Sequence, residues 1–530
     1  MRKPITMTSI KRYCPECGSG SVVKNAHEKD GTQRYKCTTC GHRPDHPLLK
    51  PPIEVLDCSR YIDFIHELIN SGKPCRLLIT AAQNATPILM SFFEACQNYC
   101  RLNTANLIVI PYRYHNPTSV WTTDDNSQNW WDTNIVQYLI NERITLNQNL
   151  ILMGDIKTQP TAVRPLEGFE GITQDKSGIF AHPKVELLSV PTPQNKLPKM
   201  LATTGAITRK NYTDSKAGKK GEFHHTFGGI VIEIERNKFH MRQVIATMDG
   251  SFCDLEYEYK KKGRKPIKAD ALILGDTHYE FMNSDVRKAT FEGAESITQV
   301  LKPKYIIHHD AWDGYAISHH HDKEPFIQYS KHQTGRNDVF QSLKSFFEFI
   351  DKITPEFSTN IFVASNHPEF LMRWIKEANP KTDHTNALFW TKTYQYLLEN
   401  TQATNTGTAT PDPFDYWARQ LLKSYKKSRF LKRDESFVIK DIELGYHGDR
   451  GPNGSRGTPT AYTKIGVKVV TGHVHSCGIK DGVYTVGTSS HLKLDYNSGP
   501  SGWLNCHCVL YPNGKRTLIV VLPGAEWRLT

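Results

Sequence analysis

Five short motifs of histidine, aspartate and asparagine follow one another through the second half of this 530-residue sequence. Each stands at or just past the end of a short apolar run: Gly275-Asp276-Thr277-His278, His309-Asp310-Ala311-Trp312-Asp313, Ser365-Asn366-His367, His447-Gly448-Asp449 and Gly472-His473-Val474-His475. Carboxylates, imidazoles and one amide are ligands suited to a pair of catalytic divalent cations. The sequence therefore predicts a metal-dependent hydrolytic centre.

The apolar runs before these motifs predict strands that would position them. Residues 271–274, 305–307, 361–364 and 467–470 are such runs. Ligands gather at the carboxyl ends of the strands in a parallel sheet, so the motifs are expected at one edge of a sheet. Amphipathic helices are expected between them, and one apolar face is marked by Val339, Leu343, Phe346, Phe347 and Ile350.

In their order and spacing, the five motifs resemble those of the calcineurin-like metallophosphoesterases, over residues 268 to about 500. The resemblance implies a β-sandwich flanked by helices, in a domain covering residues 268–530. Two positions depart from the family pattern, because His309 and Ser365 stand where the family has turn glycines.

The resemblance also implies a role for each motif residue. One metal would be held by Asp276, His278 and His475, and the other by Asn366, His447 and His473. Asp310 would bridge the two metals. His367 would act near the leaving group, as general acid or by stabilising charge, and Asp313 would support the site. His447 carries the least motif information, because it is a single residue.

Two cations in such a site activate a water molecule and clamp the phosphoryl oxygens. Mixed oxygen and nitrogen ligands without thiolate suit manganese, iron or zinc better than magnesium or calcium. The expected reaction is hydrolysis of a phosphoester, and manganese is the expected metal.

A second metal site is predicted near the start of the chain. Cys14 and Cys17 form one C-x2-C pair, and Cys37 and Cys40 form another nineteen residues later. Two such pairs close a tetrahedral site for structural zinc. With short strands expected around residues 21–24 and 33–36, residues 1–48 are interpreted as a zinc ribbon.

Residues 52–258 alternate strand and helix patterns, which predicts an α/β domain separate from the other two. Strands are expected at residues 76–80, 106–110, 150–153 and 229–234, with a helix at 86–99. This segment has no nucleotide-binding glycine fingerprint, and its role stays open. The basic stretch from Lys260 to Lys268 is expected to separate it from the metal-binding domain.

Composition restricts the function classes. With 38% hydrophobic residues and no apolar run long enough to span a bilayer, the chain is expected to be globular and cytoplasmic, with reduced thiols. The net charge is +12. Basic clusters at residues 209–220 and 260–268 fit a polyanionic partner, although such clusters are as often plain surface.

The ribbon and the basic clusters favour DNA as the substrate. SbcD-type repair nucleases are the closest functional analogy, and the layout also resembles pre-early, host-DNA-degrading proteins of coliphages. That resemblance implies a manganese-dependent DNase in the infected bacterial cytoplasm, with a second phage protein or a homo-oligomer as further partners. Two alternatives remain: a phosphatase or phosphodiesterase acting on a protein or small molecule, and a DNA-binding or assembly protein whose phosphoesterase domain is structural.

Overall fold

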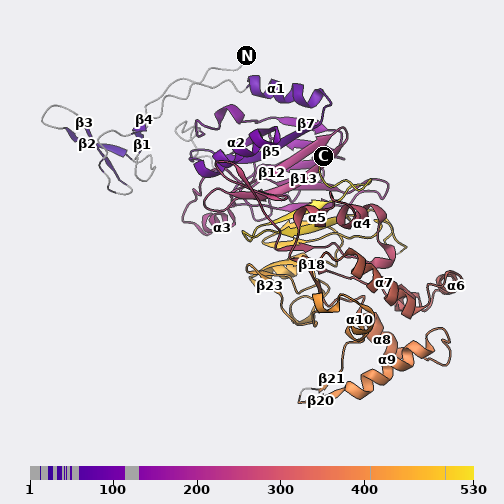
Figure 1. Cartoon of the computed structure of the whole chain (residues 1–530). Coiled ribbons are helices and arrows are strands. Elements are labelled where there is room, and N and C mark those ends of the chain that lie inside the picture. Colours follow the sequence, from indigo (N-terminus) through magenta and orange to yellow (C-terminus); the bar gives the residue numbers. More distant parts are fainter. Residues whose placement is uncertain are drawn as a thin grey trace.

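The structure is a computed structural model that describes residues 12–13, 22–27, 33–38, 41, 43, 48–49, 59–113, 131–405, 407–495 and 497–529. It is a mixed α/β protein in which several sheets stack in layers through the middle of the molecule (Figure 1). Below, the first half means residues 75–245 and the second half means residues 271–520.

A six-stranded sheet in the second half carries most of the predicted motifs. Its order is β22-β19-β18-β17-β28-β29. The first four strands are parallel neighbours: β22 (Ser428–Phe430), β19 (Thr359–Phe362), β18 (Tyr305–His308) and β17 (Ala271–Ile273). The hairpin of β28 (Cys506–Leu510) and β29 (Arg516–Val520) pairs antiparallel with β17. The strands predicted near residues 271, 305 and 361 are confirmed.

A ten-stranded sheet faces it and draws on both halves. Five of its strands come from the second half: β23 (Val438–Ile439), β24 (Ile442–Glu443), β25 (Lys468–Thr471), β27 (Val483–Thr485) and β26 (Gly478–Lys480). The other five come from the first half: β10 (Leu187–Val190), β11 (Lys199–Thr203), β9 (Ser177–Phe180), β8 (Leu150–Met153) and β7 (Arg143–Asn147). Ile273, Ile307, Val470 and Tyr484 belong to one buried core between the two sheets.

A four-stranded sheet of the first half extends the layer of the six-stranded sheet. Its strands are, in order, β13 (Lys238–Ile245), β12 (Gly228–Glu235), β5 (Cys75–Gln83) and β6 (Ala105–Tyr112). Its outer strand β13 lies beside β29, where the Thr517 hydroxyl donates to the Gln243 carbonyl at 2.7 Å. One face packs on β7–β9 and β11, and the other is covered by α2 (Met90–Asn103).

The α/β character expected for residues 52–258 is present, but this segment shares a sheet with the second half. Strand β10 pairs antiparallel with β26, and Leu187 lies opposite Ile479. The basic stretch at residues 260–268 is no bare linker, because β16 (Arg264–Pro266) pairs with β15 (Tyr257–Tyr259), which in turn pairs with β14 (Phe252–Asp254). Long-range pairing of this kind leaves no trace in local sequence pattern.

Helices cover the six-stranded sheet and extend beyond it, with α8–α10 at the end of the molecule remote from α1 (Ser59–Asn70) (Figure 1). The helices after β17 are α4 (Ser284–Phe291), α5 (Ile297–Leu301), α6 (Pro325–Thr334), α7 (Val339–Ile353), α8 (Glu369–Glu377), α9 (Ala387–Asn400), α10 (Pro413–Leu421) and α11 (Pro459–Tyr462). The apolar face predicted for α7 is buried along its length. No helix within the described ranges is both long and apolar enough to cross a membrane.

In the ribbon segment, β2 (Val22–His27) and β3 (Gln33–Cys37) pair antiparallel, in line with the two expected strands. Cys37 lies buried at the end of β3. Cys14, Cys17 and Cys40 lie outside the described residues, so the four-cysteine zinc site stays a prediction.

Candidate metal centre

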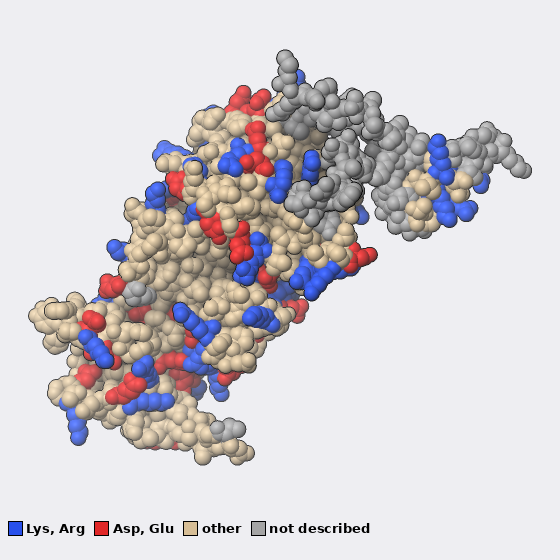
Figure 2. All heavy atoms as spheres, turned by 180° about the vertical axis from the view of Figure 1, so that it is seen from behind, with Lys and Arg blue, Asp and Glu red and all other residues tan. Residues whose placement is uncertain are grey.

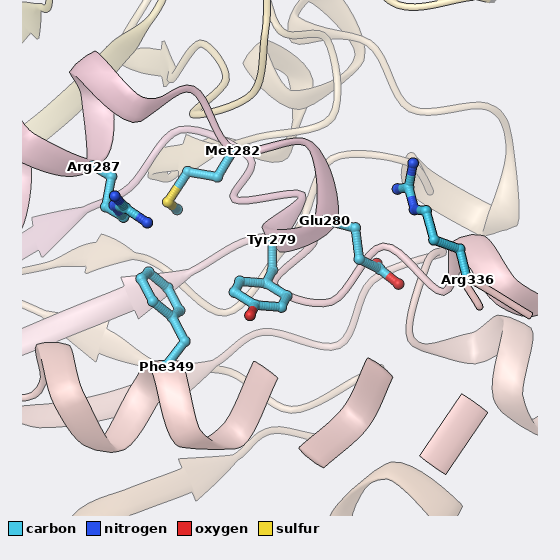
Figure 3. Close-up of a pocket in the computed structure, with 6 residues that line it drawn as sticks. All are labelled: Tyr279, Glu280, Met282, Arg287, Arg336 and Phe349. Atoms are coloured by element: carbon cyan, nitrogen blue, oxygen red, sulfur yellow. The ribbon is translucent and has the colours of Figure 1, made fainter. Parts of the chain in front are cut away.

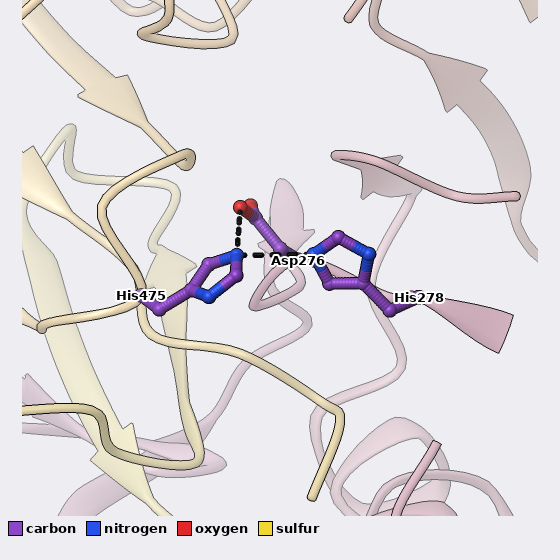
Figure 4. A group of neighbouring side chains, drawn as sticks. All are labelled: Asp276, His278 and His475. Atoms are coloured by element: carbon purple, nitrogen blue, oxygen red, sulfur yellow. Dashed lines mark hydrogen bonds and ion pairs between the residues drawn. The ribbon is translucent and has the colours of Figure 1, made fainter. Parts of the chain in front are cut away.

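The first ligand turn lies directly after β17. His507 on β28 accepts a hydrogen bond from the Gly275 amide at 2.9 Å and so fixes where the turn begins. Asp276 and His278 are both buried, and they meet His475 from the turn that follows β25 (Figure 4). The Nε2 atom of His475 lies 3.0 Å from Asp276 Oδ2 and 3.0 Å from His278 Nε2. These three residues, predicted to share one metal, therefore converge in the structure.

A second group lies beside the first. Asp310, after β18, places Oδ2 3.0 Å from His447 Nε2, and His473 completes a set whose ligand atoms all lie within 4.8 Å of one another. The two groups are joined, because the His473 backbone amide donates to Asp276 Oδ2 at 2.8 Å. Asp310 also accepts from the His367 amide through Oδ1 at 3.3 Å.

A third group contains the residues predicted to assist rather than bind metal. His278 Nδ1 lies 2.8 Å from Asp313 Oδ1, and His367 Nδ1 lies 2.9 Å from the Asp313 carbonyl. A carbonyl oxygen only accepts, so His367 Nδ1 carries the proton and donates it. The other ring nitrogen of His367, Nε2, is then left facing Asp310 Oδ2 at 4.0 Å.

Two buried oxygen atoms suggest that cations complete this site. Asp276 Oδ1 and Asn366 Oδ1 have no hydrogen-bond partner among the residues that the structure describes. Leaving a buried polar atom unpaired costs about 1–3 kcal/mol, and such atoms are rare in proteins. Both belong to the predicted ligand set, one from each metal, so the donor set fits a pair of divalent cations.

The backbone at the site is held in an unusual conformation. His278, Asp310, His473 and His475 all have positive φ, at 39°, 38°, 71° and 55°. Left-handed backbone at non-glycine residues costs about 1–3 kcal/mol each and clusters at functional sites. At Gly472 a Cβ would lie 2.1 Å from Asp276 Oδ1, so only glycine fits between the two ligand turns.

The charges of the ligands are tightly coupled. Burial alone would raise the pKa of Asp276, but His447 and His475 outweigh it and lower that pKa to about 2. Burial likewise opposes ionisation of His278, yet its contact with Asp313 raises its pKa to about 9. Both shifts favour the charged forms of these side chains, and a cation bound to His278 would replace its proton.

Residues that no sequence motif marked form hydrogen bonds to the side of the ligands away from the metal centre. The Glu280 carboxylate accepts from the Asp313 amide at 3.0 Å and from the Ser342 hydroxyl on α7 at 2.6 Å. Burial and the nearby Asp313 raise the pKa of Glu280 to about 7. Its position two residues after His278 was visible in the sequence, but a single glutamate forms no pattern.

A cavity of about 280 Å³ adjoins this support (Figure 3). It is lined by Tyr279, Glu280, Met282, Arg287, Arg336 and Phe349. Arg336 lies over the rings of Phe281 and Tyr315, at 4.9 and 4.1 Å from their centroids. A guanidinium is thus held close to the ligand turn after β17.

The predicted basic clusters lie on the surface. Residues 209–210 and much of α3 (Lys216–His224) are exposed, as is most of 260–268. Some of their charges are balanced locally: Lys219 pairs with Asp214, and Lys261 with Glu94. Figure 2 shows basic and acidic side chains mixed over the face that it presents.

Comparison with known proteins gives one informative match. No family model matches this chain. The chain is 32% identical over 468 residues to "Protein A1" of Escherichia phage T5, and the match covers 85% of this chain and 82% of that protein. The expected likeness to a coliphage protein is thereby confirmed, and the match extends over more than the metal-binding segment.

Proposed function

This chain belongs to the family of Protein A1 of Escherichia phage T5, and from that premise we propose that it is a phage nuclease that hydrolyses DNA phosphodiesters with two divalent cations. The observation that carries the proposal is the convergence of Asp276, His278 and His475 beside Asp310, His447 and His473. Neighbouring strand ends in two facing sheets supply these side chains, which provide the carboxylate and imidazole ligands that a hydrolytic two-metal site uses.

The metal ligands of this site would be Asp276, His278 and His475 for one cation and Asn366, His447 and His473 for the other, with Asp310 between them. Manganese fits this donor set best, with iron or zinc as alternatives. When bound, the cations would supply Lewis-acid activation of water and neutralise the phosphate charge.

His367 is the residue proposed to handle the leaving group. Its Nδ1 proton is engaged by the Asp313 carbonyl, so Nε2 is the atom that can hold or give up a second proton. A protonated Nε2 next to the departing oxygen would assist bond cleavage as a general acid. Asp313 therefore acts by orienting both His278 and His367.

DNA is proposed as the substrate because of features outside the metal centre. These are the net charge of +12, the exposed basic clusters and the predicted four-cysteine ribbon. Phosphate contacts from lysine and arginine give affinity without sequence selectivity, which suits a degradative enzyme. We place this activity in the cytoplasm of the infected bacterium.

Purified full-length protein should be incubated with linear and circular duplex DNA, in Mn²⁺ and in EDTA. Cleavage with Mn²⁺ and none with EDTA is expected. Intact DNA under every metal condition would contradict the proposal. If the protein bound DNA without cleaving it, a DNA-binding or assembly role with a structural phosphoesterase domain would be favoured. Rapid turnover of small aryl phosphomonoesters without salt-sensitive DNA binding would favour a phosphatase.

A further inference from the structure

The two halves of the molecule have the same strand topology. In the first half β5 is parallel to β6 and antiparallel to β12, which pairs with β13. In the second half β17 is parallel to β18 and antiparallel to β28, which pairs with β29. Each half builds this four-strand unit from its first two strands and its last two strands in chain order, and in the second half β19 and β22 extend the sheet beyond it.

The ten-stranded sheet repeats the correspondence about its centre. From the centre outwards, the first half contributes β10, β11, β9, β8 and β7, and the second contributes β26, β27, β25, β24 and β23. From the centre outwards, successive neighbouring strands pair antiparallel, parallel, parallel and antiparallel in both halves. At the centre Leu187 pairs with Ile479, its own counterpart, as a two-fold relation between the halves would require.

Hydrogen bonds outside the regular strands match as well. The Ala206 amide donates to the Thr226 carbonyl, as the Thr488 amide donates to Leu504, both at 2.9 Å. The next residue along donates to the end of the first strand: Ile207 to Ala81 at 2.8 Å, and Ser489 to Asp276 at 2.7 Å. In both halves a glycine, Gly205 or Gly487, immediately precedes these residues.

We propose that the first half is a second, metal-free copy of the sandwich that carries the metal centre. The matched hydrogen bonds place Ala81 at the position of Asp276. A second pair of hydrogen bonds also matches: the Thr204 amide donates to the Phe180 carbonyl, as the Val486 amide donates to Thr471. This pair aligns the turn after β9 with the turn after β25. Two residues after the aligned pair Phe180 and Thr471, His182 corresponds to His473. Two residues further on, Lys184 corresponds to His475.

A lysine ammonium lies at strand ends that correspond to those of the metal centre. Lys157 Nζ donates to the Pro111 carbonyl at 3.1 Å and to the Gly154 carbonyl at 2.7 Å. These carbonyls lie at the ends of β6 and β8, the counterparts of the strands that precede Asp310 and His447. The ammonium of Lys157, a residue that is exposed overall, satisfies these carbonyls and would repel a divalent cation bound beside it.

Other side chains of this region are already paired. Lys184 is buried and contacts Glu186 at 2.5 Å and Asp481 at 2.7 Å. His182 accepts from the Lys184 amide through Nδ1 at 3.0 Å and donates to the Gln159 carbonyl through Nε2 at 3.1 Å. Both ring nitrogens of His182 are therefore occupied.

The first half retains a role in positioning the metal centre. Its residue Thr192 exchanges two backbone hydrogen bonds with Ser501, at 3.1 and 2.8 Å. Two residues further on, the Trp503 ring meets the ring of His475 edge to face, with centroids 4.1 Å apart. The metal-free copy thus holds the segment that packs against a ligand of the other copy.

The proposal rests on the proposed function only in assigning the metals to the second half. Its test is a crystal structure of the full chain soaked in Mn²⁺, examined for anomalous peaks. We expect peaks among Asp276, Asp310 and His475, none between the Pro111 and Gly154 carbonyls, and superposition of the nine matched strands of each half. A peak beside Lys157, or halves that do not superpose, would overturn it. Absence of peaks in both halves would contradict the proposed function but uphold the metal-free first half.

A solution measurement tests whether Lys157 only satisfies the two carbonyls or belongs to a region that binds metal. Lys157→Met should leave the manganese content per chain unchanged and lower the melting temperature by a few degrees, because the two carbonyls lose their donor. Loss of one or more manganese equivalents in Lys157→Met, with the wild-type melting temperature retained, would show instead that this region holds a metal. Exposed Lys196→Met in the same half is the matched control.

Discussion

The Nδ1 atom of His278 lies 2.8 Å from Asp313 Oδ1, while the amide of Asp313 itself donates to Glu280. The carboxylate fixes the imidazole so that its Nε2 faces His475 and Asp276. Partners of this kind hold a metal-binding histidine in one tautomer and raise its basicity. A chain of hydrogen bonds therefore leads from Ser342 on α7 through Glu280 and Asp313 to the proposed metal ligand His278.

Asp313→Asn should weaken this support without removing a metal ligand. Loss of such a partner lowers metal affinity or activity by roughly 10–100-fold. We expect a decrease of that size in kcat for DNA cleavage, together with weaker manganese binding in calorimetric titrations. The exposed Asp322→Asn is the control and should match wild type.

Asp310→Ala should abolish cleavage, since Asp310 is the proposed bridge between the metals. DNA binding, measured by fluorescence anisotropy in EDTA, should stay within about two-fold of wild type because the basic clusters are untouched. Full cleavage by this variant would refute the bridging role. Circular dichroism provides the check that the fold is retained.

Gly472→Ala tests the close approach of two ligand turns. The added Cβ would lie 2.1 Å from Asp276 Oδ1, so either that carboxylate or the turn must move. We expect at least a ten-fold loss of manganese affinity. Gly171→Ala, where a Cβ meets nothing within 4 Å among the described atoms, should keep the wild-type affinity.

Cys14→Ser tests whether the predicted ribbon is independent of the metal centre. Elemental analysis should show one zinc fewer per chain and an unchanged manganese content, with weaker DNA binding. Simultaneous loss of both metals would contradict independent sites. Cys100→Ser in α2 serves as the thiol control, and its zinc content should equal that of wild type.

Glu233 should make the protein sensitive to acid. Burial would raise its pKa, but Arg242, at 2.8 Å, lowers it from 4.5 to about 2. A depressed carboxyl pKa contributes stability that is present above pH 4.5 and is lost as pH falls towards 2. The shift corresponds to about 3 kcal/mol.

Glu233→Gln should therefore lower the free energy of unfolding at pH 7 by about 3 kcal/mol, because it leaves Arg242 buried beside only one carboxylate. Its unfolding free energy should also fall less steeply than that of wild type between pH 4.5 and 2. Denaturant unfolding across this range measures both effects. Equal slopes in variant and wild type would contradict the assignment, and the exposed Glu235→Gln should behave as wild type.

The sequence predicted those features that depend on neighbouring residues. The strand before Asp276 and the buried face of α7 follow from local apolar patterns, and both are present. It did not predict the sheet shared by β10 and β26, because that pairing joins segments that are far apart in the chain.

Within the candidate site, the motifs identified the residues that converge but not those that support them. His507 fixes the turn before Asp276, yet no sequence motif marks it, because its partner Gly275 is distant in sequence. No sequence motif marks Glu280 either, for a related reason. Its importance comes from burial and from Ser342 on α7, neither of which a short motif records.

The pairing of β10 with β26 has a consequence for synthesis on the ribosome. Leu187 and Ile479 are separated by 292 positions (479 − 187). At about 5–20 residues per second, β10 waits roughly 15–60 s for its partner strand to be made. During that interval an unpaired strand edge is exposed to other nascent chains, and such edges invite aggregation. Slower translation of the segment between the two strands should therefore lower the yield of correctly folded protein.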